Sequence, residues 1–169
     1  MAVPTRVEGD VYVNGSLSSK TMTLPASAVG DAQVQASAGI NATKLQHQHR
    51  KGLAQASGTT ATAETRVVHV AAAAGTLTRF EAGVVVPPSN GGGDDRTVTF
   101  DLKVNGSTVL AATIIIDKTN TARQVETATI SSPDLVAGDV VEIDITVGGS
   151  TGTQAQGAFA QVTVNEHPQ

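Results

Sequence analysis

The sequence predicts an all-β protein, in which an extended N-terminal arm with a β-hairpin precedes a C-terminal antiparallel β-sandwich of jelly-roll type. Three observations carry this prediction. Residues 66–164 alternate apolar and polar side chains with the two-residue period of half-buried strands. Glycine, proline and asparagine interrupt the alternation at the spacing of turns. No long segment of this region has the 3.6-residue period of an amphipathic helix.

About seven strands are expected in this region. The strand at 76–86 ends at Pro87-Pro88, and the glycine-rich stretch 89–95 then forms a loop. Asn105-Gly106 predicts a tight turn, because both residue types tolerate positive φ. The expected strands cover residues 66–72, 76–86, 97–104, 109–116, 124–130, 141–147 and 158–164.

Residues 1–57 differ in composition, being polar and poor in aromatic side chains. Asn14-Gly15 lies between alternating apolar residues and predicts a β-hairpin. Apolar residues are spread too thinly here for a separate core, so the arm is either disordered or ordered by packing on sister chains or a larger partner. The hairpin favours ordering. We therefore predict an arm at 1–57 that oligomerises or packs on a larger partner, a linker at 58–65 and a sandwich at 66–169.

Composition and charge narrow the function. The net charge is −4, and the longest basic cluster is His49-Arg50-Lys51, which is too short for a nucleic-acid-binding face. The chain has no cysteine, so we expect neither disulfides nor a thiolate metal site. The start of the sequence shows no secretion signal, and the apolar run 114–116 is too short for a bilayer. We expect no membrane partner and synthesis in the cytoplasm.

His47-Gln48-His49 is the local motif with the clearest ligand potential. Residues two apart in an extended segment project to the same side. Three copies around a threefold axis would present six imidazoles, an arrangement suited to a transition metal. The alternative is a solvated polar stretch, or stacked rings without metal. No Asp or Glu lies within ten residues, so a metal at His47 and His49 would be shared between chains.

Catalysis finds little support in the sequence. No nucleophile elbow, phosphate-binding loop, zinc-protease motif or dinucleotide fingerprint occurs, so we expect no enzyme. His69 is interpreted as a structural strand residue rather than a general base. Asp94-Asp95 suggests calcium, but its spacing matches no EF-hand, and an ordinary hairpin loop is the favoured interpretation.

Sugar binding is a rival function for a β-sandwich. The chain has three Phe, one Tyr and no Trp to stack on sugar rings. Phe80 and Phe100 fall on predicted buried faces, which leaves Tyr12 and Phe159. We therefore do not expect strong glycan binding.

Two stretches of the arm carry a family resemblance, Val11-Tyr12-Val13-Asn14-Gly15-Ser16-Leu17 and Ala38-Gly39-Ile40-Asn41-Ala42-Thr43-Lys44-Leu45-Gln46-His47. They resemble the N-terminal segments of tailed-bacteriophage capsid decoration (cement) proteins and head fibres. The C-terminal part is similar to the compact β-sandwich knobs of those proteins. The resemblance implies a homotrimer on the virion surface, seated on the major capsid protein.

We therefore expect a structural virion protein, most simply a capsid decoration protein that clamps neighbouring major capsid subunits. The alternative is a head or tail fibre protein that mediates adhesion to the host surface. The residues expected to contact the capsid or sister chains are Val11, Tyr12, Val13, Leu17, Leu24, Ile40 and Leu45.

Overall fold

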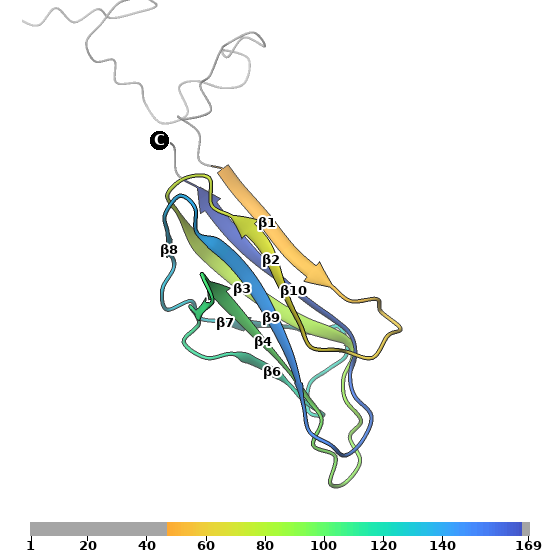
Figure 1. Ribbon diagram of the computed structural model, residues 1–169. Coiled ribbons are helices and arrows are strands. Elements are labelled where there is room, and N and C mark those ends of the chain that lie inside the picture. Colours follow the sequence, from red (N-terminus) through yellow and green to blue (C-terminus); the bar gives the residue numbers. More distant parts are fainter. Residues whose placement is uncertain (1–46, 167–169) are drawn as a thin grey trace, which may run out of the picture. The chain divides into compact units, whose positions relative to one another are not determined.

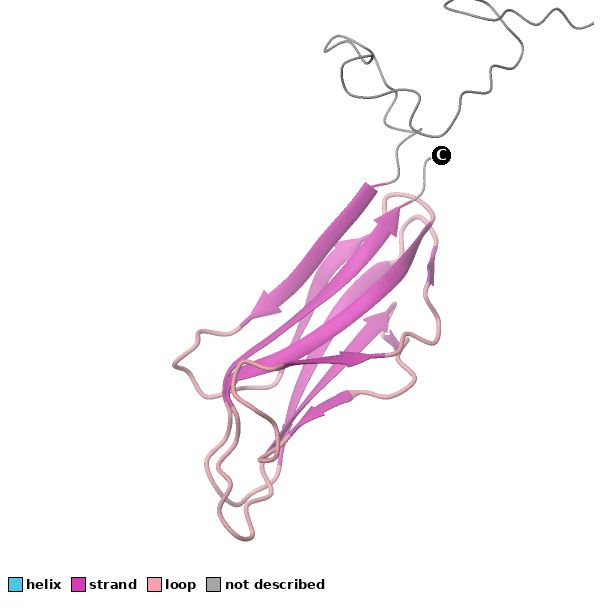
Figure 2. Ribbon diagram, turned by 180° about the vertical axis from the view of Figure 1, so that it is seen from behind, coloured by secondary structure: helices cyan, strands magenta, loops and turns pink. Residues whose placement is uncertain are grey.

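The computed structural model describes residues 47–166, and this part of the chain consists of β-strands and loops (Figure 1). The same view from behind shows strands and connections only (Figure 2), which confirms the predicted all-β class. Within these residues there is no helix of the length and apolarity needed to cross a bilayer. The strands are β1 (His47–Ala54), β2 (Glu64–Val70), β3 (Gly75–Val86), β4 (Thr97–Val104), β5 (Ser107–Thr108), β6 (Ile114–Ile116), β7 (Val125–Ala128), β8 (Asp134–Leu135), β9 (Val140–Gly148) and β10 (Gln156–Glu166).

The strands form two antiparallel sheets that pack face to face. Sheet A has the order β1-β10-β3-β7, with β8 also pairing β3, and sheet B has the order β2-β9-β4-β5, with β6 also pairing β4. Eight of the ten strands are longer than two residues. Numbered along the chain, these eight are ordered 1-8-3-6 in sheet A and 2-7-4-5 in sheet B. This is the strand order of a jelly roll, as the sequence predicts.

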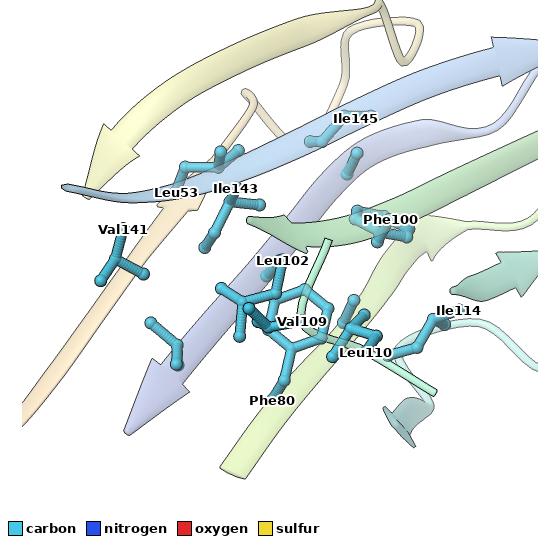
Figure 3. Close-up of a cluster of buried hydrophobic side chains, with 14 of the residues drawn as sticks. Leu53, Phe80, Phe100, Leu102, Val109, Leu110, Ile114, Val141, Ile143 and Ile145 are labelled. Carbon is cyan, nitrogen blue, oxygen red and sulfur yellow. The ribbon is translucent and has the colours of Figure 1, made fainter. Parts of the chain in front are cut away.

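The core lies between the sheets, and Figure 3 shows its side chains converging from both. Phe80 of sheet A and Phe100 and Ile143 of sheet B are fully buried. Along β4 and β9, buried residues alternate with half-buried ones, as the two-residue period predicts. Each fully buried large side chain stabilises the fold by about 1.5–3 kcal/mol.

One expected strand, at 109–116, is broken in the structure. Asn105 and Gly106 have φ values of 51° and 79°, so the predicted tight turn forms and leads into β5. The chain then leaves sheet B, because Leu110 bridges to Ile130 and the Ala111 N–H donates to Thr129 O. It returns to β4 only at β6. The apolar run is thus divided between an isolated bridge to the segment after β7 and the short strand β6, and does not form one continuous strand.

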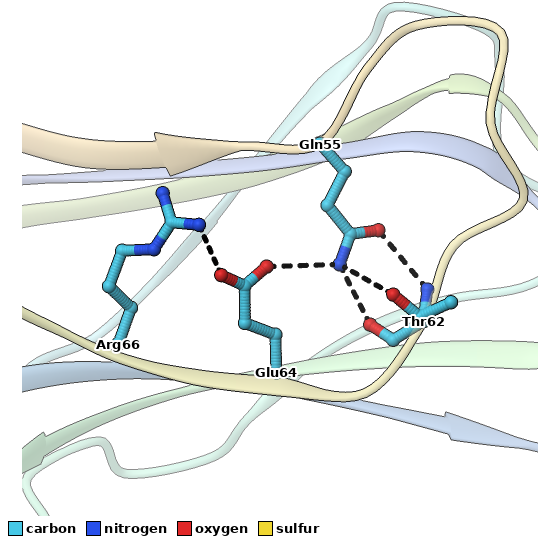
Figure 4. Close-up of polar contacts among 4 residues, drawn as sticks. All are labelled: Gln55, Thr62, Glu64 and Arg66. Carbon is cyan, nitrogen blue, oxygen red and sulfur yellow. Dashed lines mark hydrogen bonds and ion pairs between the residues drawn. The ribbon is translucent and has the colours of Figure 1, made fainter.

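The sandwich begins earlier in the chain than the sequence-based boundaries place it. All eight residues of β1, which were assigned to the arm, pair with β10. The predicted linker at 58–65 is ordered: residues 58–63 belong to the β1–β2 connection, in which Ala61 is buried, and residues 64 and 65 begin β2. The Gln55 side chain bonds both backbone groups of Thr62, and its Nε2 also donates to Glu64, which pairs with Arg66 (Figure 4).

The physical reason for this correction lies in the inner face of β1. The buried position in β1 is Leu53, and the inward positions before it are polar. The sequence of β1 therefore lacks the alternation of apolar and polar residues that marks a strand, although all eight of its residues pair with β10. The expected hairpin and the contact residues of the arm lie outside the described residues, namely Val11, Tyr12, Val13, Leu17, Leu24, Ile40 and Leu45.

The acidic loop after β3 is held by its own hydrogen bonds. Asp94 Oδ2 accepts from Ser89 Oγ at 2.6 Å and from the Gly91 N–H at 2.9 Å. Asp95 Oδ1 accepts from the N–H groups of Ser150 and Thr151, which lower the pKa of that carboxyl. Asp94 therefore holds its own loop together, and Asp95 joins it to the loop after β9. Because β3 and β4 belong to different sheets, this loop is a connection between the sheets and not the expected hairpin loop.

Candidate functional site

Three histidines and a buried glutamate gather at the end of the sandwich where β1 begins and β10 ends. We call His47, His49, His69 and Glu166 the histidine cluster. His47 is the register partner of Glu166. β1 and β10 belong to sheet A, whereas His69 lies on β2 of sheet B. The cluster therefore joins the two sheets beside the point where residues 1–46 are attached.

The edge strand β1 brings the first two histidines to one side. The rings of His47 and His49 are stacked, with centroids 6.3 Å apart and an angle of 9° between planes. This agrees with the expected projection of residues two apart. Directly paired residues of an antiparallel ladder share a face, so His49 points the same way as its buried partner Val164. The inner face of the sandwich is thus polar at this end.

A β-bulge in β2 brings His69 to the same place. Val67 pairs with Glu142 and His69 pairs with Val141, so Val68 is an additional residue in β2. Strict alternation would turn His69 outward. The bulge turns it inward, where its side chain is only 10% exposed. The rings of His49 and His69 then lie with centroids 5.6 Å apart.

Glu166 is the acceptor at the centre of the cluster. Its Oε1 lies 2.9 Å from His69 Nε2 and accepts from the Ala72 N–H at 2.9 Å, while Oε2 lies 3.4 Å from His49 Nε2. Burial alone would raise the pKa of this carboxyl. The hydrogen bonds from Ala72 and His69, with the charges of His69 and His49, outweigh burial and lower the pKa below its ordinary value of 4.5. Glu166 is therefore an ionised, buried acceptor at neutral pH.

A glycine allows the next strand to pass close to this carboxylate. Gly75 pairs with Glu166 at the start of β3. A Cβ at Gly75 would lie 2.5 Å from Asn165 O and 3.2 Å from Glu166 Cα, which no side chain tolerates without a backbone shift. The close packing around the carboxylate depends on this position having no side chain.

The chemistry of the cluster is that of an anchoring point between strands. Glu166 engages donors from β2 and from the segment after it, and an imidazole of β1 lies beside it. Among residues 47–166, no group of three or more His, Cys, Asp or Glu is arranged to hold a metal ion. The expected metal at His47 and His49 would require several copies of the chain, and it stays a prediction.

Sequence reasoning found His47 and His49 but missed the two other members of the cluster. His69 and Glu166 are 97 residues apart, and a bulge cannot be read from alternation alone. One signal was available. Glu166 continues the inward phase of Val162 and Val164, so a carboxylate falls where an apolar residue is expected.

The fold and the cluster together define a jelly-roll domain with an N-terminal extension joined at a polar end. The sequence matches no protein family, and a search of curated proteins finds no significant relative. Function is therefore inferred from the way the extension joins the domain and from its surfaces.

Proposed function

We propose that the protein is a structural virion protein, a trimeric capsid decoration protein that clamps neighbouring major capsid subunits. The observation that supports this most directly is the pairing of His47 with Glu166. Both ends of the jelly roll lie together, and the 46 residues before His47 depart from that end. β3 runs from Gly75 beside Glu166 to Val86 beside Gln156, so the loops after β3 and β9 lie at the opposite end. A domain attached at one end and free at the other suits display on a surface.

The attachment is also built to resist load. β1 is paired with β10 over eight consecutive residues, so a pull on residues before His47 would load all these pairs together. The histidine cluster adds a cross-connection from this end to sheet B. An N-terminal anchor would transmit force into the whole sandwich rather than peel off one strand.

The mechanism of such a protein is multivalent clamping. Each trimer would present three arms to several capsid subunits, so modest contacts add through effective concentration. Linking subunits then stabilises the assembled shell, because a ligand that binds only the assembled state shifts the equilibrium toward it.

Two measurements on the full chain test the proposal. Sedimentation should give the mass of a trimer, and the protein should co-sediment saturably with phage heads that lack their decoration protein. A chain beginning at Gln46 should be a folded monomer that does not bind heads. Val13→Asp should weaken both oligomerisation and binding, whereas Val136→Asp, at an exposed position between β8 and β9, should weaken neither. A monomeric full-length chain that does not bind heads would overturn the proposal.

The second candidate is a head or tail fibre protein that adheres to the host surface. It is favoured by a ligand-sized cleft on the outer face of sheet A. Saturable adhesion of purified protein to host cells, without binding to heads, would support the fibre role over decoration.

A further inference from the structure

The outer face of sheet A carries a cleft of about 350 Å³, within the range of roughly 300–1,000 Å³ that is typical of ligand sites. Its lining comes from β1, β3, β7 and β10, so the cleft crosses the whole sheet. A second cleft of about 380 Å³, beside β6 and β7, has no aromatic residue in its lining. The cleft on sheet A does have one, Phe159.

Small residues flank the half-buried ring of Phe159 on both neighbouring strands. In the register of the sheet, Phe159 lies between Ala54 of β1 and Gly83 of β3. A Cβ at Gly83 would lie 2.8 Å from Phe159 Cζ, so the ring leans over the glycine. Val125, which is 46% exposed, pairs with Gly83 and forms the far wall. The result is an aromatic platform on an open sheet face.

A fixed polar pair lies one step along the same strands. Gln161 lies between Gly52 of β1 and Glu81 of β3, and its Nε2 donates to Glu81 Oε2 at 2.7 Å. Arg79 forms an ion pair with Glu81, whose side chain is only 13% exposed. The carboxylate is therefore held in place before any ligand arrives, and acceptor and amide groups stand next to the ring.

The charge of the cleft is opposite to that of the chain. Arg50 lines it with a side chain on this outer face, and Glu81, the acidic residue of the lining, is already paired with Arg79. The chain as a whole carries a net charge of −4. A locally basic cleft on an acidic protein favours an anionic ligand.

We propose that this cleft binds an acidic pyranoside, such as a uronic or sialic acid residue of a glycan. A pyranose has one face of C–H groups, which packs on the negative face of an aromatic ring. Its hydroxyl edge needs paired acceptors and donors, which Glu81 and Gln161 supply. Its carboxylate is placed toward Arg50, whose planar guanidinium suits carboxylate recognition.

A single aromatic platform limits the affinity of one site. The scarcity of aromatic residues predicts no strong glycan binding, and Phe80 and Phe100 are fully buried, as their strand positions predict. One half-buried ring and a few polar contacts give weak binding, because immobilising a small ligand has its own free-energy cost. In an oligomer, the same sites would act together on a multivalent glycan. The site itself does not depend on capsid binding.

The test is an NMR titration of the ¹⁵N-labelled full chain with matched sugars. Methyl glucuronoside and methyl glucoside share one ring and differ at the carboxylate, and sialyllactose and lactose form a second pair. The acidic member of at least one pair should shift the amide signals around Phe159 and Gln161 saturably. Its affinity should be at least about tenfold higher than that of its neutral partner, because a tenfold change in Kd corresponds to the free energy of about one good contact. Absence of saturable shifts with both acidic sugars, or equal affinity within both pairs, would overturn the proposal.

Substitutions then assign the contacts. Phe159→Leu keeps an apolar side chain but removes the ring, and it should weaken binding at least about tenfold. Arg50→Gln lies on the surface and should leave the thermal unfolding unchanged while removing the preference for the acidic sugar. Arg66→Gln on β2 and Ile115→Ala at the second cleft are controls that should bind as the unaltered chain does. Unchanged binding in both cleft variants would overturn the assignment, whether or not the protein decorates capsids.

Discussion

His69 Nε2 lies 2.9 Å from Glu166 Oε1, and this contact joins β2 of one sheet to the last residue of β10 in the other. Both side chains are at most about a tenth exposed. The contact closes the core at the end where residues 1–46 are attached. It exists because a bulge turns His69 inward and because Gly75 lets β3 pass beside Glu166.

Glu166→Gln should reduce the stability of the protein in a way that depends on pH. The folded chain lowers the pKa of this carboxyl below 4.5, so its ionised form stabilises the fold. That contribution is complete above the unfolded pKa and is lost as pH falls through the lower folded pKa. We expect the variant to be about 1–3 kcal/mol less stable than the unaltered chain at pH 5.5. The difference should shrink toward pH 3.

Urea unfolding between pH 5.5 and pH 3 measures this convergence. The comparison with the unaltered chain is necessary, because other carboxyls with lowered pKa values also make stability depend on acid pH. These are Asp95, Asp117, Asp139 and Asp144. Parallel stability curves for the two proteins would show that Glu166 is not the acceptor described.

A double-mutant cycle should separate the two histidines that approach Glu166. His69 is almost buried and is hydrogen-bonded at 2.9 Å, whereas His49 is 35% exposed and lies 3.4 Å away. We expect His69→Gln and Glu166→Gln to couple by about 1 kcal/mol or more, because the two side chains are in direct contact. The coupling of His49→Gln with Glu166→Gln should be smaller, because water screens exposed pairs. Equal couplings in urea unfolding at pH 6 would contradict this ranking.

Strands with a clean two-residue period could be predicted from the sequence. In β4 and β9, inward apolar residues alternate with polar ones, and burial against the other sheet reinforces that pattern. β1 could not be predicted in the same way. Its inward residues His47, His49 and Lys51 line a polar end of the core, and only Leu53 reaches the apolar part.

The candidate site was predictable only in part. His47 and His49 are neighbours in sequence, so their shared side follows from strand geometry alone. Their partners come from β2 and β10, and the inward turn of His69 depends on an extra residue in the ladder. Long-range register of this kind is decided by the packing of whole sheets and not by local residue preferences.

Gly83→Ala should destabilise the protein and disturb the cleft on sheet A. A Cβ there would lie 2.4 Å from Gln124 O and 2.8 Å from Phe159 Cζ, so both a backbone segment and the ring would have to move. Overpacking of this kind costs about 1–3 kcal/mol. Gly58→Ala is the matched control, because nothing lies within 4 Å of its added Cβ. Thermal unfolding of the two variants measures the difference, and equal midpoints would contradict the close approach at Gly83.

The start of the folded domain can be located by truncation. A chain beginning at Gln46 retains β1 and should unfold cooperatively, with a midpoint close to that of the full chain's sandwich. A chain beginning at Ala63, near the boundary that sequence patterns suggest, lacks β1 and the buried side chain of Leu53. Leu53 alone contributes about 1.5–3 kcal/mol by its burial. Loss of β1 also leaves the long strand β10 as an open edge, which promotes aggregation.

We therefore expect the chain beginning at Ala63 to be aggregated or unfolded at temperatures where the chain beginning at Gln46 is folded. Leu53→Ala in the full chain is the companion variant and should cost about 2–5 kcal/mol without exposing the edge. If the chain beginning at Ala63 stayed monomeric and unfolded at the same temperature as the longer one, β1 would be an appendage and not part of the jelly roll.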